Sequence, residues 1–131
     1  MASIFTKIVN REIRAYIVAE DEKFISFLDS NPLAIGHTLV IPKREEDYIF
    51  DLTDAELSDL MVFSKRVAKA IQSVVPCKRI GISVFGLEVP HVHVHLVPLN
   101  LTGDINFAKP KLSLSKEEFI SVTQKIKSAF E

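Results

Sequence analysis

Apolar and polar positions follow the period of β-strands over the first third of the chain. Two stretches rich in β-branched and aromatic residues, AYIVAE (15–20) and KFISFLD (23–29), are separated by two acidic residues. This arrangement predicts a β-hairpin. A third strand is expected over 37–41, because Gly36 and Pro42 bound that apolar run.

Further along the chain, the apolar period becomes that of an amphipathic helix. Thr53 and Glu56 have the spacing of a capping box, and Pro76 would end the helix that they begin. Apolar residues three or four positions apart predict its core-facing stripe, formed by Leu57, Leu60, Met61, Val67, Ala68, Ile71 and Val75. A second capping box, at Ser115 and Glu118, begins a terminal helix with an apolar face of Phe119, Val122, Ile126 and Phe130.

Two more strands complete the predicted elements, one over 79–85 and one in the run HVHVHLVPL that starts at His91. Strands with helices inserted among them predict an α+β fold, with a five-stranded antiparallel sheet, one long central helix and a C-terminal helix. The chain has 131 residues and is 47% apolar, which suits one core, so a single domain over 1–131 is expected. Residues 101–131 would be a C-terminal extension ending in the helix.

Three of the four histidines, His91, His93 and His95, occupy every second position of the fifth predicted strand. Alternate residues of a strand point to the same face, so three imidazoles would line one surface, the outer two anchored roughly 13 Å apart. Imidazole titrates near neutral pH and can bind metal, transfer protons or attack phosphorus. The candidate chemistry is therefore expected on this strand.

Two kinds of chemistry suit such a face, beside an exposed strand that carries histidines without function. Three imidazoles are one known set of zinc ligands, although such a run usually needs further ligands, and His37 is the only other histidine. The second is nucleophilic catalysis at phosphorus, in which a neutral imidazole forms a covalent intermediate while its neighbours stabilise charge and move protons. Three histidines in register weaken the non-functional interpretation, but their spacing does not choose between the two chemistries.

Composition and charge exclude several classes of function. The 16 Lys and Arg residues nearly balance 17 Asp and Glu residues, so no general basic field would attract nucleic acid or an anionic membrane. No apolar stretch reaches the roughly 20 residues that span a bilayer, and the N-terminal residues lack a targeting pattern, so a cytoplasmic location is expected. Cys77 is the only cysteine, which excludes an internal disulfide and a cysteine-based metal cluster.

The run HVHVHLVP (91–98) resembles the HxHxHxx signature of the histidine triad (HIT) superfamily, whose members bind nucleotides and hydrolyse or transfer nucleoside monophosphates. The flanking segments are similar to the Hint, or nucleotide-binding, branch, and they read SIFTKIVNREIRAYIVAEDEKFISFLDSNPLAIGHTLVIPKREED (3–47) and GLEVPHVHVHLVP (86–98). The resemblance covers most of residues 3–98. It leaves the stretch after Asn100 unmatched.

The resemblance implies a role for every histidine. His93 matches the central histidine, which attacks the α-phosphate and holds the nucleoside monophosphate as a phosphoramidate. His95 would hydrogen-bond the phosphate and help the leaving group, His91 would orient its neighbours, and His37 matches a fourth histidine that completes the site. Asp29 would grip the ribose hydroxyls beside an apolar base pocket of Phe5, Ile8, Ile13 and Phe27. These positions also suit ordinary core packing for the apolar four and a turn for Asp29.

Some members of this family carry a structural zinc site made of two cysteines, a histidine after IPK and the first triad histidine. The matching positions in this chain are Ser3, Thr6, Glu45 and His91. Hydroxyls are poor zinc ligands compared with thiolate and imidazole. No structural zinc, and no metal or other cofactor, is therefore expected.

The loop before the triad departs from the family pattern. Members often have glutamine there, in a G-Q-x-V-x-H arrangement, whereas this chain has G-L-E-V-P-H. Leu87 cannot donate to a phosphate, and Glu88 would repel one if it faced the site. Three outcomes stay open: backbone amides and Ser83 replace the lost donors, the site accepts a different leaving group, or activity is weak.

The resemblance implies a hydrolase or transferase that acts on the α-phosphate of purine nucleoside 5′-phosphoramidates or related nucleotides, through a nucleotidyl-histidine intermediate. One alternative is a purine-nucleotide-binding regulatory module with weak or no catalysis. Another is a metal-dependent hydrolase. The resemblance further implies a homodimer, in which the helix that begins near Thr53 and the strand after it pack against their symmetry mates.

Overall fold

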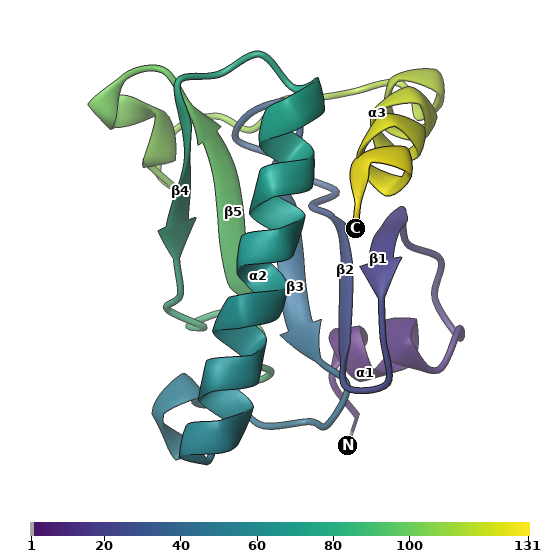
Figure 1. Cartoon of the computed structure of the whole chain (residues 1–131), viewed down its shortest axis with the longest axis vertical. Coiled ribbons are helices and arrows are strands. Elements are labelled where there is room, and N and C mark those ends of the chain that lie inside the picture. Colours follow the sequence, from purple (N-terminus) through teal and green to yellow (C-terminus); the bar gives the residue numbers. More distant parts are fainter. Residues whose placement is uncertain (1) are drawn as a thin grey trace.

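A computed structural model describes residues 2–131, which form one antiparallel sheet flanked by helices (Figure 1). The strands lie in the order β1-β2-β3-β5-β4. Their bounds are β1 (Ile17–Glu20), β2 (Phe24–Leu28), β3 (Thr38–Pro42), β4 (Arg79–Ser83) and β5 (Val94–Leu99). The helices are α1 (Ile4–Val9), α2 (Asp54–Val74) and α3 (Lys116–Ala129), with the short 3-10 helices η1 (Ile49–Asp51) and η2 (Thr102–Ile105). The predicted α+β fold, with five antiparallel strands, a long central helix and a C-terminal helix, is confirmed.

Local sequence sets the beginnings of the two long helices. At the start of α2, Glu56 N–H donates to the Thr53 hydroxyl at 3.1 Å, and Thr53 N–H donates to the Glu56 carboxylate at 3.0 Å. Ser115 and Glu118 form the same reciprocal pair before α3. Both predicted capping boxes are confirmed, and each satisfies backbone donors that the first turn of a helix leaves without partners.

Different helices pack against the two faces of the sheet (Figure 1). On one face lie α2 and α3, where Val94 and Leu96 of β5 share a core with Leu60 and Ile71 of α2. The opposite face carries α1 and a smaller apolar cluster of Phe5, Ile8, Ile25, Phe27, Leu39 and Ile41. Because neighbours in an extended chain alternate between faces, the triad histidines point away from α2 and toward the α1 side.

Two features of the fold differ from the sequence prediction. Strand β5 begins at Val94, so His91 and His93 precede it, and the predicted start of this strand at His91 was wrong. The reason is that Val92 N–H donates to the carbonyl of Glu46 at 2.7 Å, which draws this segment away from the sheet ladder. Helix α1 was not predicted. It has six residues and begins with a cap in which Thr6 N–H donates to the Ser3 hydroxyl at 3.0 Å.

The C-terminal residues return across the molecule. After β5 the chain forms η2 beside β4, and then crosses to α3, which lies near β1 at the other side of the sheet (Figure 1). There the ring of Phe119 stacks on Tyr16, with centroids 4.8 Å apart. No helix within residues 2–131 combines the length and the apolar character that crossing a membrane requires.

Candidate active site

A cavity of about 390 Å³ opens on the α1 face of the sheet. Phe27 of β2 lies opposite Leu39 of β3, and Leu39 lies opposite His95 of β5, so these three side chains share that face. Phe5 of α1 packs against the rings of Phe27, at 5.6 Å, and of His93, at 5.0 Å. The cavity therefore joins an apolar end, near α1 and β2, to the histidines before and within β5.

The ring of His93 has a defined proton position. Its Nδ1 lies 2.7 Å from the carbonyl oxygen of His91. Because a carbonyl only accepts, Nδ1 carries the proton, and the lone pair of the neutral ring is on Nε2. No other group within residues 2–131 is hydrogen-bonded to Nε2, and His93 lines the cavity. The nitrogen that can attack an electrophile is therefore free of protein partners.

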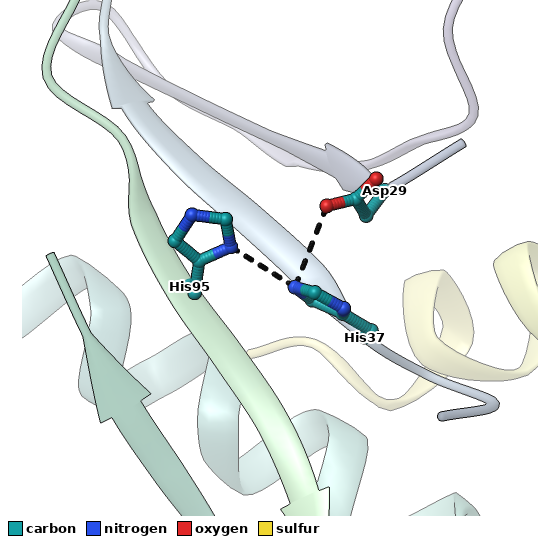
Figure 2. A group of neighbouring side chains, drawn as sticks. All are labelled: Asp29, His37 and His95. Atoms are coloured by element: carbon teal, nitrogen blue, oxygen red, sulfur yellow. Dashed lines mark hydrogen bonds and ion pairs between the residues drawn. The ribbon is translucent and has the colours of Figure 1, made fainter. Parts of the chain in front are cut away.

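The ring of His37 determines where His95 carries its proton (Figure 2). Leu33 N–H donates to Nδ1 of His37 at 2.9 Å, so the proton of a neutral His37 is on Nε2. This Nε2–H donates to Nδ1 of His95 at 3.0 Å. The proton of His95 must then be on its own Nε2, which is buried and has no hydrogen-bond partner among the described residues. His95 therefore brings an unmatched N–H donor to the cavity wall.

Burial keeps both of these rings neutral. It lowers the pKa of His37 to about 4, and the positive charge of Lys111 adds a smaller effect in the same direction. Burial also lowers the pKa of His95 to about 3, followed by the influence of His37 and His93. Both rings are uncharged at neutral pH, where the proton positions deduced above therefore apply.

Asp29 contributes to a turn and to the cavity at once. One carboxylate oxygen, Oδ1, accepts a hydrogen bond from Asn31 N–H at 2.8 Å, which is the turn that the sequence allowed. The other, Oδ2, lies 3.5 Å from Nε2 of His37, and the residue lines the cavity (Figure 2). Burial raises the pKa of this carboxyl. The structure thus brings Asp29 to the site, and its grip on a ribose stays a prediction.

Asp29, His37 and His95 also have the composition of a metal site, with one ligand atom from each within 4.8 Å of the others. Two histidines and one carboxylate form a familiar ligand set. However, coordination by Nε2 of His37 needs a lone pair on that nitrogen, and the N–H of Leu33 at Nδ1 keeps the proton there. The donor chemistry therefore favours a hydrogen-bonded chain at this position over a metal centre.

His91 lies behind the cavity and not on its wall. The ring is buried, its Nε2–H donates to the carbonyl of Pro42 at 2.8 Å, and its Nδ1 accepts from the hydroxyl of Ser3 at 2.8 Å. All three imidazoles lie on the α1 side of the sheet, but the ring of His91 is bonded to Ser3 and to the end of β3 and does not line the cavity. Its carbonyl accepts from Nδ1 of His93, and the orienting role that the resemblance implied for His91 stays a prediction.

The four positions that match the family's zinc ligands meet around His91, where hydrogen bonds join them. The carboxylate of Glu45 accepts from Ser3 N–H and from the Thr6 hydroxyl, both at 2.6 Å. These two bonds lower the pKa of the Glu45 carboxyl to about 2. Glu45 is therefore ionised at neutral pH and ties α1 to the segment that follows β3.

All four apolar residues that were predicted for the base pocket line the cavity, namely Phe5, Ile8, Ile13 and Phe27. Three of them also belong to the apolar cluster under α1, so core packing and pocket lining are the same contacts here. Ser83 is not among the lining residues. It lies opposite His95 in the β4–β5 ladder, on the same face, and its contact with a phosphate stays a prediction.

Comparison with known proteins decides the family. The sequence pattern of the HIT domain matches residues 10–101. The chain belongs to the HIT family.

Relatives within the HIT family resemble nearly the whole chain. A HIT-like protein of Borreliella burgdorferi is 33% identical over 94% of each chain. An adenosine 5′-monophosphoramidase of Schizosaccharomyces pombe is 32% identical over 98% of each chain. Among solved structures, a HIT-like protein of Bartonella henselae has 28% identity and a TM-score of 0.84, over 98% of this chain and 96% of that one.

The two unusual residues of the loop before the triad have different surroundings. Leu87 is 89% exposed and lies outside the cavity, so its lack of a donor has no direct effect there. Glu88 lines the cavity. Glu88 therefore faces the site, and its repulsion of a phosphate stays a prediction.

Sequence reasoning missed one wall of the cavity, most of which lies beyond the HIT match. Phe85 stacks on the ring of His95, with centroids 5.2 Å apart and an 8° interplanar angle, and Phe107 presents its edge to His95 at 4.7 Å. Lys111 and Arg14 add positive charge to the lining. Phe107 and Lys111 carry no local motif, and only the return of the chain after η2 brings them to the triad.

Proposed function

We propose that this HIT protein is a hydrolase or transferase acting on the α-phosphate of purine nucleoside 5′-phosphoramidates or related nucleotides. The observation that carries this proposal is the pair of proton positions in one cavity, a lone pair on Nε2 of His93 and an N–H donor on Nε2 of His95. One nitrogen can attack phosphorus while the other stabilises negative charge. The named activity of the Schizosaccharomyces pombe relative supports this choice of substrate.

In the first step of the proposed reaction, Nε2 of His93 attacks the α-phosphorus. A bond from nitrogen to phosphorus forms, and the bond from phosphorus to the leaving group breaks. The ring becomes positively charged, and its Nδ1–H bond to the carbonyl of His91 stabilises that charge. The Nε2–H of His95 donates to a phosphate oxygen, and a departing amine takes up one proton from solvent.

In the second step, water adds to the phosphorus and gives one proton to solvent, the bond to His93 breaks with its electron pair returning to Nε2, and the nucleoside monophosphate is released. The purine would lie against the apolar end of the cavity, beside Phe5 and Phe27. Oδ2 of Asp29, the oxygen that is not used in the turn, would accept from the ribose hydroxyls. The step needs no metal, because the imidazoles supply both the nucleophile and the hydrogen-bond donor.

Turnover of adenosine 5′-phosphoramidate tests this proposal. The wild-type protein is expected to release the monophosphate and to accumulate one nucleotidyl group per chain when the reaction is stopped rapidly with alkali, which preserves a phosphorus–nitrogen bond to histidine. Intact-mass measurement would detect the modified chain. Some conditions make transfer of the nucleotidyl group to His93 faster than hydrolysis of the intermediate. Steady turnover under those conditions without a detectable intermediate would contradict the covalent mechanism.

The presence of Glu88 in the cavity favours a second candidate, a regulatory module that binds a purine nucleotide with weak or no catalysis. A carboxylate near the phosphate would disfavour the transition state, whose charge is concentrated there. The same assay separates the two candidates. Tight binding of adenosine monophosphate without turnover of any phosphoramidate or phosphoanhydride would support the regulatory module.

The proposal includes a homodimer formed through β4 and α2. Strand β4 is at an edge of the sheet, and Ile82 on this strand is 53% exposed, while Val62 of α2 is 59% exposed. An unpaired edge with apolar side chains is suited to association with a second copy. Light scattering at micromolar concentration is expected to give twice the chain mass for the wild type, and one chain mass for Ile82→Lys. A monomeric wild type would contradict this assembly.

A further inference from the structure

The segment from Phe107 to Leu112 forms the wall of the cavity beside His95. Its backbone is fixed to the loop after β2, because Leu112 N–H donates to the carbonyl of Pro32 at 2.8 Å. At the other end of the segment, the ring of Phe107 presents its edge to His95 at 4.7 Å and to His37 at 6.0 Å. These contacts place the segment against the polar end of the site.

Lys111 is the charged residue of this wall. Its ammonium donates to the carbonyl oxygens of Phe107, at 2.6 Å, and of Lys109, at 3.0 Å. Both acceptors are neutral, and no ion pair among residues 2–131 involves Lys111. An ammonium has three donors, so one remains after these two bonds. Lys111 thus brings to the cavity a positive charge that has no close ion-pair partner, and a spare donor.

The other charges in the lining make this lysine important. Asp29 and Glu88 are both carboxylates, and the neutral His95 offsets neither of them. Arg14, the other cation of the lining, is next to Ile13 before β1, toward the apolar end. Lys111 is therefore the cation of the polar end, where it offsets one of the two carboxylate charges, and phosphate binding depends on nearby cations and charge-assisted donors.

The aromatic contacts give an order along the cavity. Phe5 touches His93, His93 touches His95, and His95 touches Phe107, so the base pocket and the Phe107–Leu112 segment lie on opposite sides of the two reactive rings. A substrate with its base beside Phe5 and its α-phosphate over His93 would therefore direct its leaving group toward this segment.

We propose that Lys111 binds the leaving group and selects nucleotides in which that group is an anionic phosphate, as in nucleoside 5′-polyphosphates. This inference rests on the proposed function and names its substrate class. When Nε2 of His93 bonds to the α-phosphorus, the bond to the bridging oxygen breaks, and the electron pair remains on that oxygen. The ammonium of Lys111 stabilises the charge that develops, so this leaving group needs no proton.

The test compares two substrates that share an adenosine and differ in leaving group, adenosine 5′-phosphoramidate and diadenosine triphosphate. Lys111→Gln is expected to lower kcat/KM for the triphosphate on the order of 10- to 100-fold, the loss typical of one charge-assisted hydrogen bond. The kcat/KM for the phosphoramidate should change much less, because its leaving group is an amine and carries no phosphate charge for Lys111 to bind. Lys109→Gln, which removes a neighbouring charge whose side chain does not line the cavity, should leave both values unchanged.

Lys111→Arg keeps the positive charge and therefore distinguishes loss of charge from a disturbed fold of the segment. This variant should keep most of the preference for the triphosphate. Equal losses on both substrates in Lys111→Gln, or no loss on either, would overturn the assignment. Measurements of nucleotide affinity test the role of Lys111 independently of catalysis. Isothermal titration calorimetry should show that Lys111→Gln weakens the binding of adenosine diphosphate more than the binding of adenosine monophosphate, even if no substrate is turned over. An unchanged ratio of the two affinities would overturn the role of Lys111 while leaving the proposed function intact.

Discussion

His93→Asn is expected to abolish turnover while leaving the affinity for a nucleoside monophosphate nearly unchanged. The asparagine amide can still donate to the carbonyl of His91, as Nδ1 of the histidine does, but it has no lone pair for attack on phosphorus. Loss of a nucleophile from a covalent mechanism typically costs at least about 10⁴-fold in kcat. Steady-state kinetics on adenosine 5′-phosphoramidate, with calorimetric titration of adenosine monophosphate, would measure both quantities.

A matched variant makes the role of His93 specific. His95→Asn keeps Nε2 of His93 and removes only the unmatched donor, so kcat should fall by roughly 10²- to 10⁴-fold, while the nucleotidyl intermediate still forms. In His93→Asn no intermediate should form at any time. Activity of His93→Asn comparable to the wild type would exclude this residue as the nucleophile and return the choice to His95.

Acidification from pH 7 to pH 5 is expected to destabilise the fold steeply. The pKa values of His37 and His95 in the folded chain, about 4 and about 3, lie below the value of 6.5 in an unfolded chain, because burial penalises the charged rings. Below pH 6.5 the unfolded chain therefore binds more protons, so stability is complete above that pH and is lost as pH falls. Each of these histidines contributes a slope that approaches about 1.4 kcal/mol per pH unit well below pH 6.5, and His91, whose pKa burial also lowers, adds to the slope in the same direction.

Urea denaturation at fixed protein concentration, at intervals between pH 7.5 and pH 5, would measure this slope. This pH range lies above the titration of the exposed carboxyls of Glu45 and Glu56. Because their pKa values are lowered in the folded chain, their contribution to stability is lost only as the pH falls below about 4.5. Asp29 acts with the opposite sign, because its pKa is raised, and it can only reduce the observed slope. His37→Gln should remove the share of the slope that this ring contributes, at most about 1.4 kcal/mol per pH unit. Stability that does not change across this range would contradict the neutral, buried state of both rings.

The parts of the fold that follow from local rules could be predicted from the sequence. The alternation of histidines with Val92, Val94 and Leu96 placed the histidines on the face away from α2, because this alternation persists in the extended residues before the strand begins. Thr53 and Ser115 marked the helix starts through caps that need only four residues. These features depend on residues that are close together in the sequence, so the local sequence pattern is enough to predict them.

The parts that depend on tertiary contacts could not be predicted in the same way. The ring of His91 does not reach the cavity, because bonds to Ser3 and Pro42, distant in sequence, turn it into the interior. The wall around Lys111 is likewise set by the path of the chain after η2. The resemblance helped with the apolar pocket and Asp29, since it carried information on such contacts, but it ended at Asn100, before the segment that closes the site.

The N–H of His95, which has no acceptor among the described residues, gives the cavity a preference for hydrogen-bond acceptors. A buried donor that is left without any acceptor costs about 1–3 kcal/mol. A ligand oxygen within hydrogen-bond distance of this nitrogen would satisfy the donor. An apolar group of the same shape would leave the donor unsatisfied. The cavity thus discriminates against molecules that merely fill it, and an inhibitor for this site should carry an oxygen at that position.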